Sequence, residues 1–424
     1  MKYSENDDLP ITHRASYAFD RREFLKTGAL ASLGVGLLSA ASKVRAAINP
    51  TPPRVQRYVP LGSTGLKISD ISFGSSRLHT GQEDLVRHAF DLGINYFDSA
   101  SDYTDGEAET TIGNALHGKR DKVVLTSKMF AYPTTTQQEM MLTLEGSLKR
   151  LQTEYVDIFF NHAVNDVARL KNPEWYEFVE KAKSQGKLKF TGMSGHAGNL
   201  GECLDYAIET GHYNVILAAH NFGQDPNFIK RFFRDFDFIA VQPELPRILA
   251  KAKSKGIGTV VMKTLMGARL NDMRPYEQGG ATFSQAAFRW VLSNSNVDAL
   301  IVTMTSLDLI DEYLGASGWR TAAAGDIPLL QRYMALNSTS HCRNGCNACE
   351  ESCPQGVPIS EVLRTRMYAR DYDDFELARR EYALLRVDAT ACLSCAATPC
   401  KGACPIGLET GAIMAPLHRM LAQV

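Results

Sequence analysis

Residues 93–109 read GINYFDSASDYTDGEAE, in which a β-type run ends at an ionisable residue. Later parts of the chain repeat this arrangement. A short run of β-forming residues ends at Asp98, and Tyr103 follows five residues later in a polar loop. Two further runs of this kind end at Lys128 and His162. The carboxyl ends of the strands of a parallel (β/α)8 barrel meet on one face, which is where active sites lie. The sequence therefore predicts that these four side chains converge.

Strand-like runs alternate with amphipathic helical runs from Ile68 onward, which is the pattern of a parallel sheet with crossover helices. A turn at Leu61–Leu66 predicts a hairpin ahead of the first barrel strand. Helices are expected at 137–151 and 284–292, among others. The predicted class is α/β, a (β/α)8 TIM barrel, with strands at residues 70–74, 94–98, 123–128, 155–161, 188–193, 214–220, 257–263 and 299–304.

The four ionisable residues resemble, one by one, the Asp, Tyr, Lys and His tetrad of the aldo-keto reductases. This resemblance implies an oxidoreductase acting on a carbonyl or an alcohol, in which Tyr103 donates the proton. Lys128 is then expected to favour the phenolate form of Tyr103, and Asp98 to hold Lys128. His162 is expected to orient the substrate oxygen. Taken singly, Tyr103 also fits a surface loop and His162 a buried structural histidine.

The resemblance extends over residues 59–314 and implies a nicotinamide cofactor, NADP(H) or NAD(H). Ser194 matches a family contact to the nicotinamide amide, but Gly195 and Leu217 replace the family's Asn and Gln. No basic residue for a 2′-phosphate stands in the segment after the eighth strand, 303–308. The predicted cofactor-binding residues are Ser194, Asn221, Lys263, Thr305 and Asp311.

Eight of the nine cysteines lie beyond residue 340, in two runs that each end in Cys-Pro. Four closely spaced cysteines followed by proline are the ligand pattern of a [4Fe–4S] cluster. The section resembles a two-cluster ferredoxin with a helical insert at 359–385. Zinc and disulfides are the alternatives, and Cys203 is predicted to be a core residue. The resemblance implies one cluster on Cys342, Cys346, Cys349 and Cys404, and a second on Cys392, Cys395, Cys400 and Cys353.

The first 46 residues resemble an export signal. Arg21–Lys26 reads RREFLK, similar to the twin-arginine motif, and the apolar run 27–41 is shorter than the roughly 18 residues of a membrane-spanning helix. Val44–Ala46 resembles a cleavage site. A periplasmic protein carried by the twin-arginine machinery is therefore predicted, with a basic tail or an uncleaved anchor as the alternatives.

The chain has 424 residues and a formal net charge of -1, so no overall field favours nucleic acid. The leading interpretation is an exported oxidoreductase for a carbonyl or alcohol, such as a sugar, with electron transfer through two clusters to a redox partner protein. The rivals are an NAD(P)H-dependent carbonyl reductase with structural clusters and a non-catalytic electron-transfer or binding subunit.

Residues 224–243 are predicted to form an ordered loop near the barrel mouth or to serve packing alone. The expected divisions are 1–46 signal peptide, 47–56 linker, 57–319 barrel, 320–340 connector and 341–424 ferredoxin-like iron-sulfur domain.

Overall fold

A computed structural model describes most of the chain beyond residue 52. All described residues belong to the compact unit Pro53–Val424. The predicted signal peptide and nearly all of the segment 224–243 lie outside them, so both stay predictions. The described ranges are 53–223, 242–266, 272–277, 282–337, 341–343, 346–372 and 374–422.

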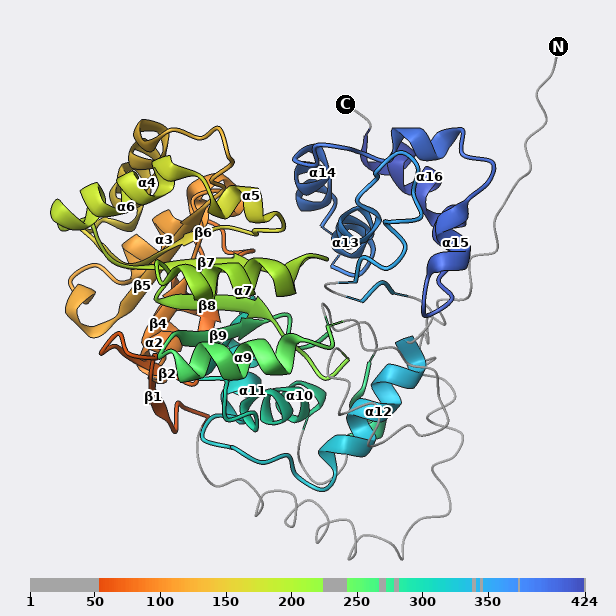
Figure 1. Ribbon diagram of the computed structural model, residues 1–424. Helices are drawn as coiled ribbons and strands as arrows, with labels where there is room; N and C mark the ends of the chain where they lie inside the picture. The colour runs from red at the N-terminus through yellow and green to blue at the C-terminus, as the bar shows by residue number, and fades with distance from the viewer. Residues whose placement is uncertain are drawn as a thin grey trace, which may run out of the picture. The chain divides into compact units, whose positions relative to one another are not determined.

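Eight parallel strands form a closed barrel in the order β10-β3-β4-β5-β6-β7-β8-β9 (Figure 1). Each lies within two residues of its predicted position, so the predicted barrel is confirmed. The strands are β3 (Ile71–Gly74), β4 (Tyr96–Asp98), β5 (Val124–Met129), β6 (Val156–Asn161), β7 (Leu188–Gly195), β8 (Val215–Ala219), β9 (Gly258–Met262) and β10 (Ala299–Thr303).

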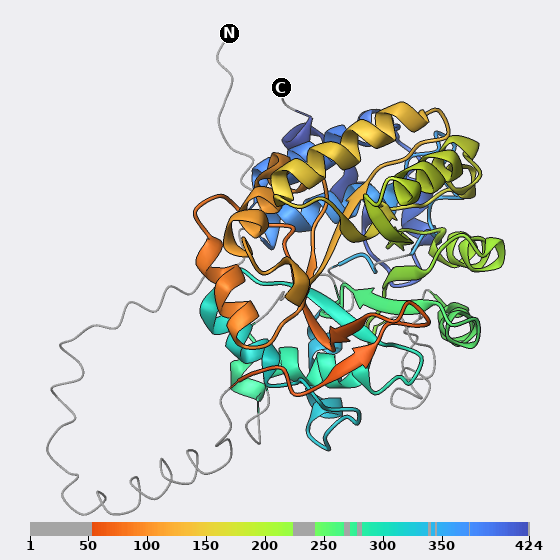
Figure 2. The same cartoon turned by 90° about the vertical axis from the view of Figure 1, so that its left-hand side faces the viewer.

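Helices alternate with the strands and surround the barrel (Figure 2). Helix α4 begins with a capping box, in which the Thr136 side chain accepts from the Glu139 N–H and the Glu139 carboxylate accepts from the Thr136 N–H. This local signal explains why its predicted bounds are correct. The helices are α2 (Glu83–Asp91), α3 (Glu107–Ala115), α4 (Gln137–Leu151), α5 (Val167–Leu170), α6 (Pro173–Ser184), α7 (Leu200–Thr210), α9 (Leu245–Ser254), α10 (Phe283–Leu292), α11 (Leu307–Leu314) and α12 (Asp326–Asn337).

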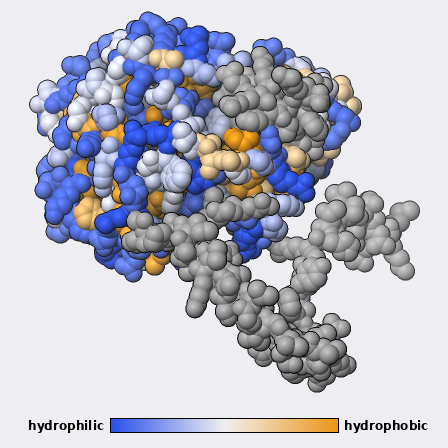
Figure 3. Space-filling view, turned by 90° about the horizontal axis from the view of Figure 1, so that it is seen from below, coloured by the Kyte–Doolittle hydropathy of each residue, from blue (hydrophilic) through white to orange (hydrophobic). Residues whose placement is uncertain are grey.

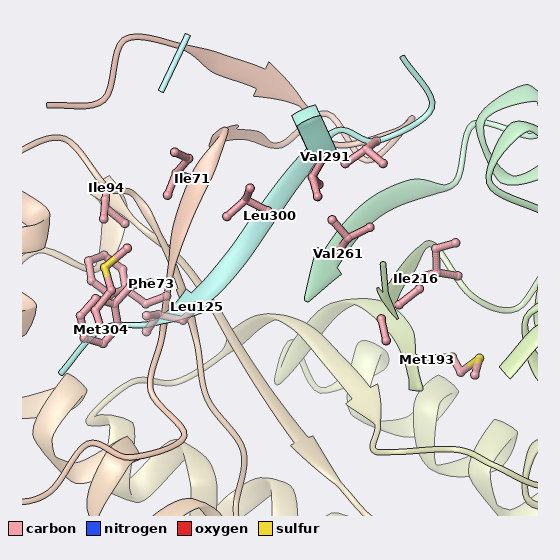
Figure 4. Close-up of a cluster of buried hydrophobic side chains, with 14 of the residues drawn as sticks. Ile71, Phe73, Ile94, Leu125, Met193, Ile216, Val261, Val291, Leu300 and Met304 are labelled. Atoms are coloured by element: carbon pink, nitrogen blue, oxygen red, sulfur yellow. The ribbon is translucent and has the colours of Figure 1, made fainter. Parts of the chain in front are cut away.

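Apolar side chains fill the barrel in two layers. The outward faces of the strands pack against the helices, as Figure 4 shows for Phe73, Ile216 and Leu300. Cys203 belongs to this outer layer, as predicted. The inner layer lies within the barrel and includes Leu61 of the hairpin. Strands β1 (Tyr58–Pro60) and β2 (Lys67–Ser69) form this antiparallel hairpin, which lies across one end of the barrel (Figure 2).

Two glycines permit close contacts in the barrel wall. A Cβ atom on Gly74 would lie 2.9 Å from the backbone of Val302 on the neighbouring strand, and one on Gly192 would lie 2.2 Å from the Phe160 ring. Any larger residue at Gly74 would separate β3 from β10, where the first and last strands close the barrel.

The last section is helical and has a hydrophobic cluster of its own. The predicted helical insert corresponds to α13 (Ile359–Arg370) and α14 (Phe375–Ala383), followed by α15 (Pro399–Ala403) and α16 (Thr410–Leu421). Among the described residues, no helix has both the length and the apolar character needed to cross a membrane. On the face shown in Figure 3, hydrophilic residues surround separate small groups of hydrophobic ones.

Candidate functional site

Asp98 and Lys128 form a buried ion pair at the carboxyl ends of β4 and β5. Asp98 pairs with Thr126 in the sheet, and Lys128, two residues further along β5, points to the same side. The Lys128 ammonium lies 2.6 Å from the Asp98 carboxylate and 2.5 Å from the Ser99 carbonyl oxygen. Both side chains are only 1% exposed. Asp98 therefore holds Lys128, as the sequence predicts.

Tyr103 and His162 complete the predicted set. The Lys128 nitrogen lies 4.8 Å from the centre of the Tyr103 ring, and the His162 ring packs edge-on against Tyr103 at 5.6 Å. All four residues line one cavity of about 590 Å³. That volume falls within the usual range of roughly 300–1,000 Å³ for small-molecule sites. The four predicted residues are therefore brought together around a space that can hold a ligand.

Two residues that the sequence did not single out support His162. Asp102 lies 3.3 Å from the His162 ring nitrogen, and it directly precedes Tyr103 in the sequence. Burial raises the pKa of Asp102, but the neighbouring His162, a backbone hydrogen bond and Lys128 together leave that pKa below its usual value. Arg169 donates to the His162 carbonyl at 2.7 Å and to the Asn161 side chain at 2.9 Å. It thereby holds the loop that positions His162.

Burial and nearby carboxylates determine the protonation of Tyr103. Burial raises its pKa well above the usual value of about 10, and the nearby charges of Asp98 and Asp102 raise it further. The Lys128 ammonium lies 4.8 Å from the centre of the Tyr103 ring, but the net effect of the surroundings on this pKa is still upward. The expected preference of Lys128 for the phenolate form is outweighed by these effects in this state, and it stays a prediction. Tyr103 is held as a neutral phenol.

Unusual backbone conformations concentrate at this end of the barrel. Thr104, Asp105, Ala163 and Lys263 all have positive φ angles, between 47° and 61°. Residues other than glycine rarely adopt this region, and such strain concentrates at functional sites. Thr104 and Asp105 directly follow Tyr103, while Ala163 directly follows His162.

The predicted cofactor residues divide into two groups. Ser194, Lys263 and Thr305 line the cavity, as does Leu217. The Ser194 hydroxyl accepts from the Ala163 N–H at 2.9 Å and can still donate to a ligand. These residues fit a nicotinamide held by fewer amide contacts than the resemblance implies.

Asn221 and Asp311 do not line this cavity. The Asn221 side chain donates to the Lys263 carbonyl oxygen at 3.2 Å and accepts from the Gly223 N–H at 3.0 Å. Asp311 lies 2.7 Å from the His88 ring. Both side chains therefore make contacts within the protein, and their assignment to a cofactor stays a prediction.

Residues of the last section also line the cavity, and sequence reasoning missed them. Helix α13 contributes Glu361, Arg364 and Tyr368, and α14 contributes Glu381. His196, just beyond β7, is missed as well, and burial lowers its pKa well below the usual value. Glu361, Arg364 and Tyr368 recur at spacings of three and four residues. This spacing indicates one helix face but not what that face contacts.

The cysteines form two groups, which are the groups that the resemblance implies. Cys342, Cys346, Cys349 and Cys404 line one small apolar cavity. Burial and the neighbouring thiols raise the pKa of Cys349 to about 12.

In the second group, burial raises the pKa of Cys392 to about 11, together with the nearby thiols of Cys353, Cys400 and Cys395. All nine cysteines lie in the described ranges, and each is free, so the disulfide alternative is wrong for this structure. No set of three or more His, Cys, Asp or Glu side chains in these ranges is arranged to hold a single metal ion. The choice between zinc and clusters therefore stays a prediction from the sequence.

Comparisons with known proteins agree with the barrel. Residues 70–216 match the model of the Aldo/keto reductase family. The L-galactose dehydrogenase of Arabidopsis thaliana is 26% identical over 292 residues, covering 60% of this chain and 86% of that protein. The L-glyceraldehyde 3-phosphate reductase of Escherichia coli O157:H7 is 25% identical over 335 residues, covering 68% of this chain and 95% of that protein. The protein is an oxidoreductase.

The fold of this oxidoreductase is shared with a solved structure, that of the aldo-keto reductase AKR11C1 from Bacillus halodurans in its holo form. The TM-score is 0.51 at 19% sequence identity, and the match covers 65% of this chain and 95% of that one. The matched family region contains all four tetrad positions. The barrel of the oxidoreductase, and not its cysteine-rich section, is the part that these comparisons support.

Proposed function

We propose that this protein interconverts a carbonyl and an alcohol on a small sugar-type substrate, outside the cytoplasm, and carries two [4Fe–4S] clusters. The observation that carries the chemistry is the buried Lys128–Asp98 pair beneath Tyr103, in a cavity of about 590 Å³. Substrates of the sugar and aldehyde type are supported by the names of the relatives, L-galactose dehydrogenase and L-glyceraldehyde 3-phosphate reductase.

Tyr103 acts as the general acid in the direction of reduction. Its neutral phenol donates a proton to the carbonyl oxygen, and the resulting phenolate is stabilised by the ammonium of Lys128 beside its ring. His162, held by Asp102 and Arg169, orients the same oxygen. A nicotinamide bound beside Ser194, Lys263 and Thr305 would supply or accept the hydride. The neutral state of Tyr103 favours reduction, since oxidation requires that residue to accept a proton.

The two cysteine groups are the proposed ligands of the clusters. A [4Fe–4S] cluster takes one thiolate per iron, so its four ligands stand further apart than those of a single metal ion. The small apolar cavity lined by Cys342, Cys346, Cys349 and Cys404 is consistent with such a ligand set. Bound clusters would exchange electrons one at a time with a redox partner protein.

Export is proposed from the sequence alone. The RREFLK motif and the apolar run after it resemble a twin-arginine signal and lie outside the described residues. That route carries folded proteins, so the clusters and a nucleotide would be bound before export. We propose the periplasm as the site of action.

The test of the catalytic proposal is Tyr103→Phe in the anaerobically purified holoprotein, with L-galactose oxidation and methylglyoxal reduction as assays. Loss of the proton donor should lower the rate by about 10²–10⁴-fold, while the denaturation midpoint stays near that of the parent. Tyr276→Phe is the matched control, because Tyr276 lies on the surface and not in the cavity. Turnover of Tyr103→Phe at the parental rate would exclude the tetrad as the catalytic centre.

A further inference from the structure

Helices α13 and α14 of the cysteine-rich section face the active-site cavity of the barrel. The segment from Tyr372 to Arg380 makes several contacts with barrel residues. Arg77 pairs with Asp374 at 3.3 Å and donates to the Tyr372 carbonyl oxygen, and Asp105 lies 3.4 Å from Arg380. The barrel alone is therefore an incomplete site.

Tyr368 lines the cavity from α13, and its hydroxyl group is placed to donate a hydrogen bond to a ligand. Its oxygen accepts hydrogen bonds from Arg364 at 2.8 Å and from Lys263 at 3.4 Å. Neither cation can accept a hydrogen bond, so the Tyr368 hydroxyl proton remains available to donate. No acceptor for it is present among the described residues. A ligand oxygen in the cavity is the natural acceptor.

Glu381 supplies a hydrogen-bond acceptor on the same side of the cavity as the Tyr368 donor. One carboxylate oxygen accepts from Arg364 at 3.0 Å, and the other makes no hydrogen bond to the residues that the structure describes. The Glu381 carboxylate is one of the groups that raise the pKa of the catalytic Tyr103, and both residues line the same cavity, so the two faces of the cavity lie within electrostatic reach of each other. A molecule held by Tyr103 thus has both a donor and an acceptor on the opposite side.

The charges next to Tyr368 are balanced. Arg364 pairs with Glu361 and Glu381, at 3.0 Å in each case, and the Lys263 ammonium makes its one hydrogen bond to the described residues with Tyr368. Around Tyr368, two cations thus face two carboxylates, while Arg386, beyond the end of α14, also lines the cavity and lies 4.8 Å from the centre of the Tyr132 ring. Arg169 also lines the cavity, but it donates to three backbone carbonyls and to Asn161 and so serves the loop.

Three stacked aromatic rings form one wall of the cavity. Phe130 stacks on His162 with ring centres 4.6 Å apart and on Tyr132 at 6.2 Å, and all three rings line the cavity. A flat apolar wall beside separate donors and acceptors suits a molecule with an apolar C–H face and several hydroxyl groups. A sugar ring has this form, and a phosphate or carboxylate does not.

We propose that α13 and α14 bind the hydroxyl groups of a neutral polyhydroxylated substrate, with Tyr368 as donor and Glu381 as acceptor. The cysteine-rich section then determines substrate choice, while the barrel supplies the chemistry. This rests on the proposed function only in taking the tetrad cavity as the substrate site.

The test is calorimetric titration of the full-length holoprotein with L-galactose. Tyr368→Phe and Glu381→Gln should each raise Kd about tenfold, the usual effect of losing one ligand hydrogen bond. Glu376→Gln is the matched control, since Glu376 lies on the same helix, is exposed and does not line the cavity. The visible spectrum and circular dichroism of each variant establish that the section is intact.

The outcomes separate the two proposals. Unchanged Kd values in both variants would overturn the binding role of α13 and α14, whatever the turnover. Parent protein that fails to bind L-galactose, or binds L-glyceraldehyde 3-phosphate more than tenfold more tightly, would overturn the neutral substrate class. Parent protein that binds L-galactose with the expected variant effects, but converts no carbonyl or alcohol, refutes the proposed function and leaves this inference standing.

Discussion

Lys128 and Asp98 are each almost fully buried, so neither charge is stable without the other. Removing one partner of a buried ion pair typically costs about 3–5 kcal/mol. Lys128→Met should therefore lower the denaturation midpoint markedly, because Asp98 is left as an unpaired buried carboxylate. Asp98→Asn combined with Lys128→Met should recover much of that loss while remaining inactive. Equal midpoints for the single and double variants would show that the pair does not stabilise the fold.

The raised pKa of Tyr103 predicts how the rate of carbonyl reduction depends on pH. Its pKa in the folded protein is raised well above about 10, so the phenol keeps its proton throughout the neutral and mildly alkaline range. The rate of carbonyl reduction should therefore show no loss from Tyr103 ionisation between pH 7 and about 10. The check is kcat for methylglyoxal reduction across this range. A fall in kcat centred near neutral pH would contradict this expectation if the residual activity of Tyr103→Phe lacks it. It would show that the Tyr103 phenol loses its proton in this range.

At the scale of single residues, the tetrad could be predicted because each member follows a strand and strand ends converge in a barrel. The protonation of Tyr103 could not be predicted, because its pKa depends on how deeply the loop is buried and on the nearby charge of Asp102. Ser194 and Lys263 lie in the cavity as the resemblance implies, whereas Asn221 does not. Its side chain bonds instead to the backbone of Gly223 and of Lys263, 42 positions away, and no local residue pattern signals the second contact.

At the scale of elements, the two cysteine groups cross between distant runs, since Cys404 joins Cys342 and Cys353 joins Cys392. The proposed clusters should therefore respond in pairs. Cys404→Ser and Cys346→Ser should perturb the same electron paramagnetic resonance signal, and Cys353→Ser the other. The measurement is the spectrum of each dithionite-reduced variant. Perturbation of one signal by both Cys346→Ser and Cys353→Ser would favour ligand sets confined to single runs.

The strands and the hairpin could be predicted because β-type runs and turn residues are local signals. Helices α13 and α14 were also expected, as a charged helical stretch. Their role over the cavity could not be predicted, because it depends on contacts such as that between Arg77 and Asp374, nearly 300 positions apart. The i, i+4 spacing of Arg364 and Tyr368 indicates a shared face and nothing about its partner.

At the scale of the whole molecule, export predicts a dependence on Arg21 and Arg22. Replacing both with Lys should retain the protein in the cytoplasm, since the motif RREFLK is the proposed signal. The protein should still fold, because the described unit begins at Pro53. Immunodetection in periplasmic and cytoplasmic fractions measures the effect. An unchanged periplasmic fraction would exclude this signal.

The order of the elements along the chain also sets an order of assembly. Roughly 100 residues separate the end of α11 at Leu314 from the end of α16 at Leu421. At the usual rate of about 5–20 residues per second, the ribosome needs about 5–20 s to add them. The barrel can close in that interval, while the helices that later face its cavity are still incomplete. A nucleotide present in the cytoplasm then meets an open barrel and needs no passage through the finished protein.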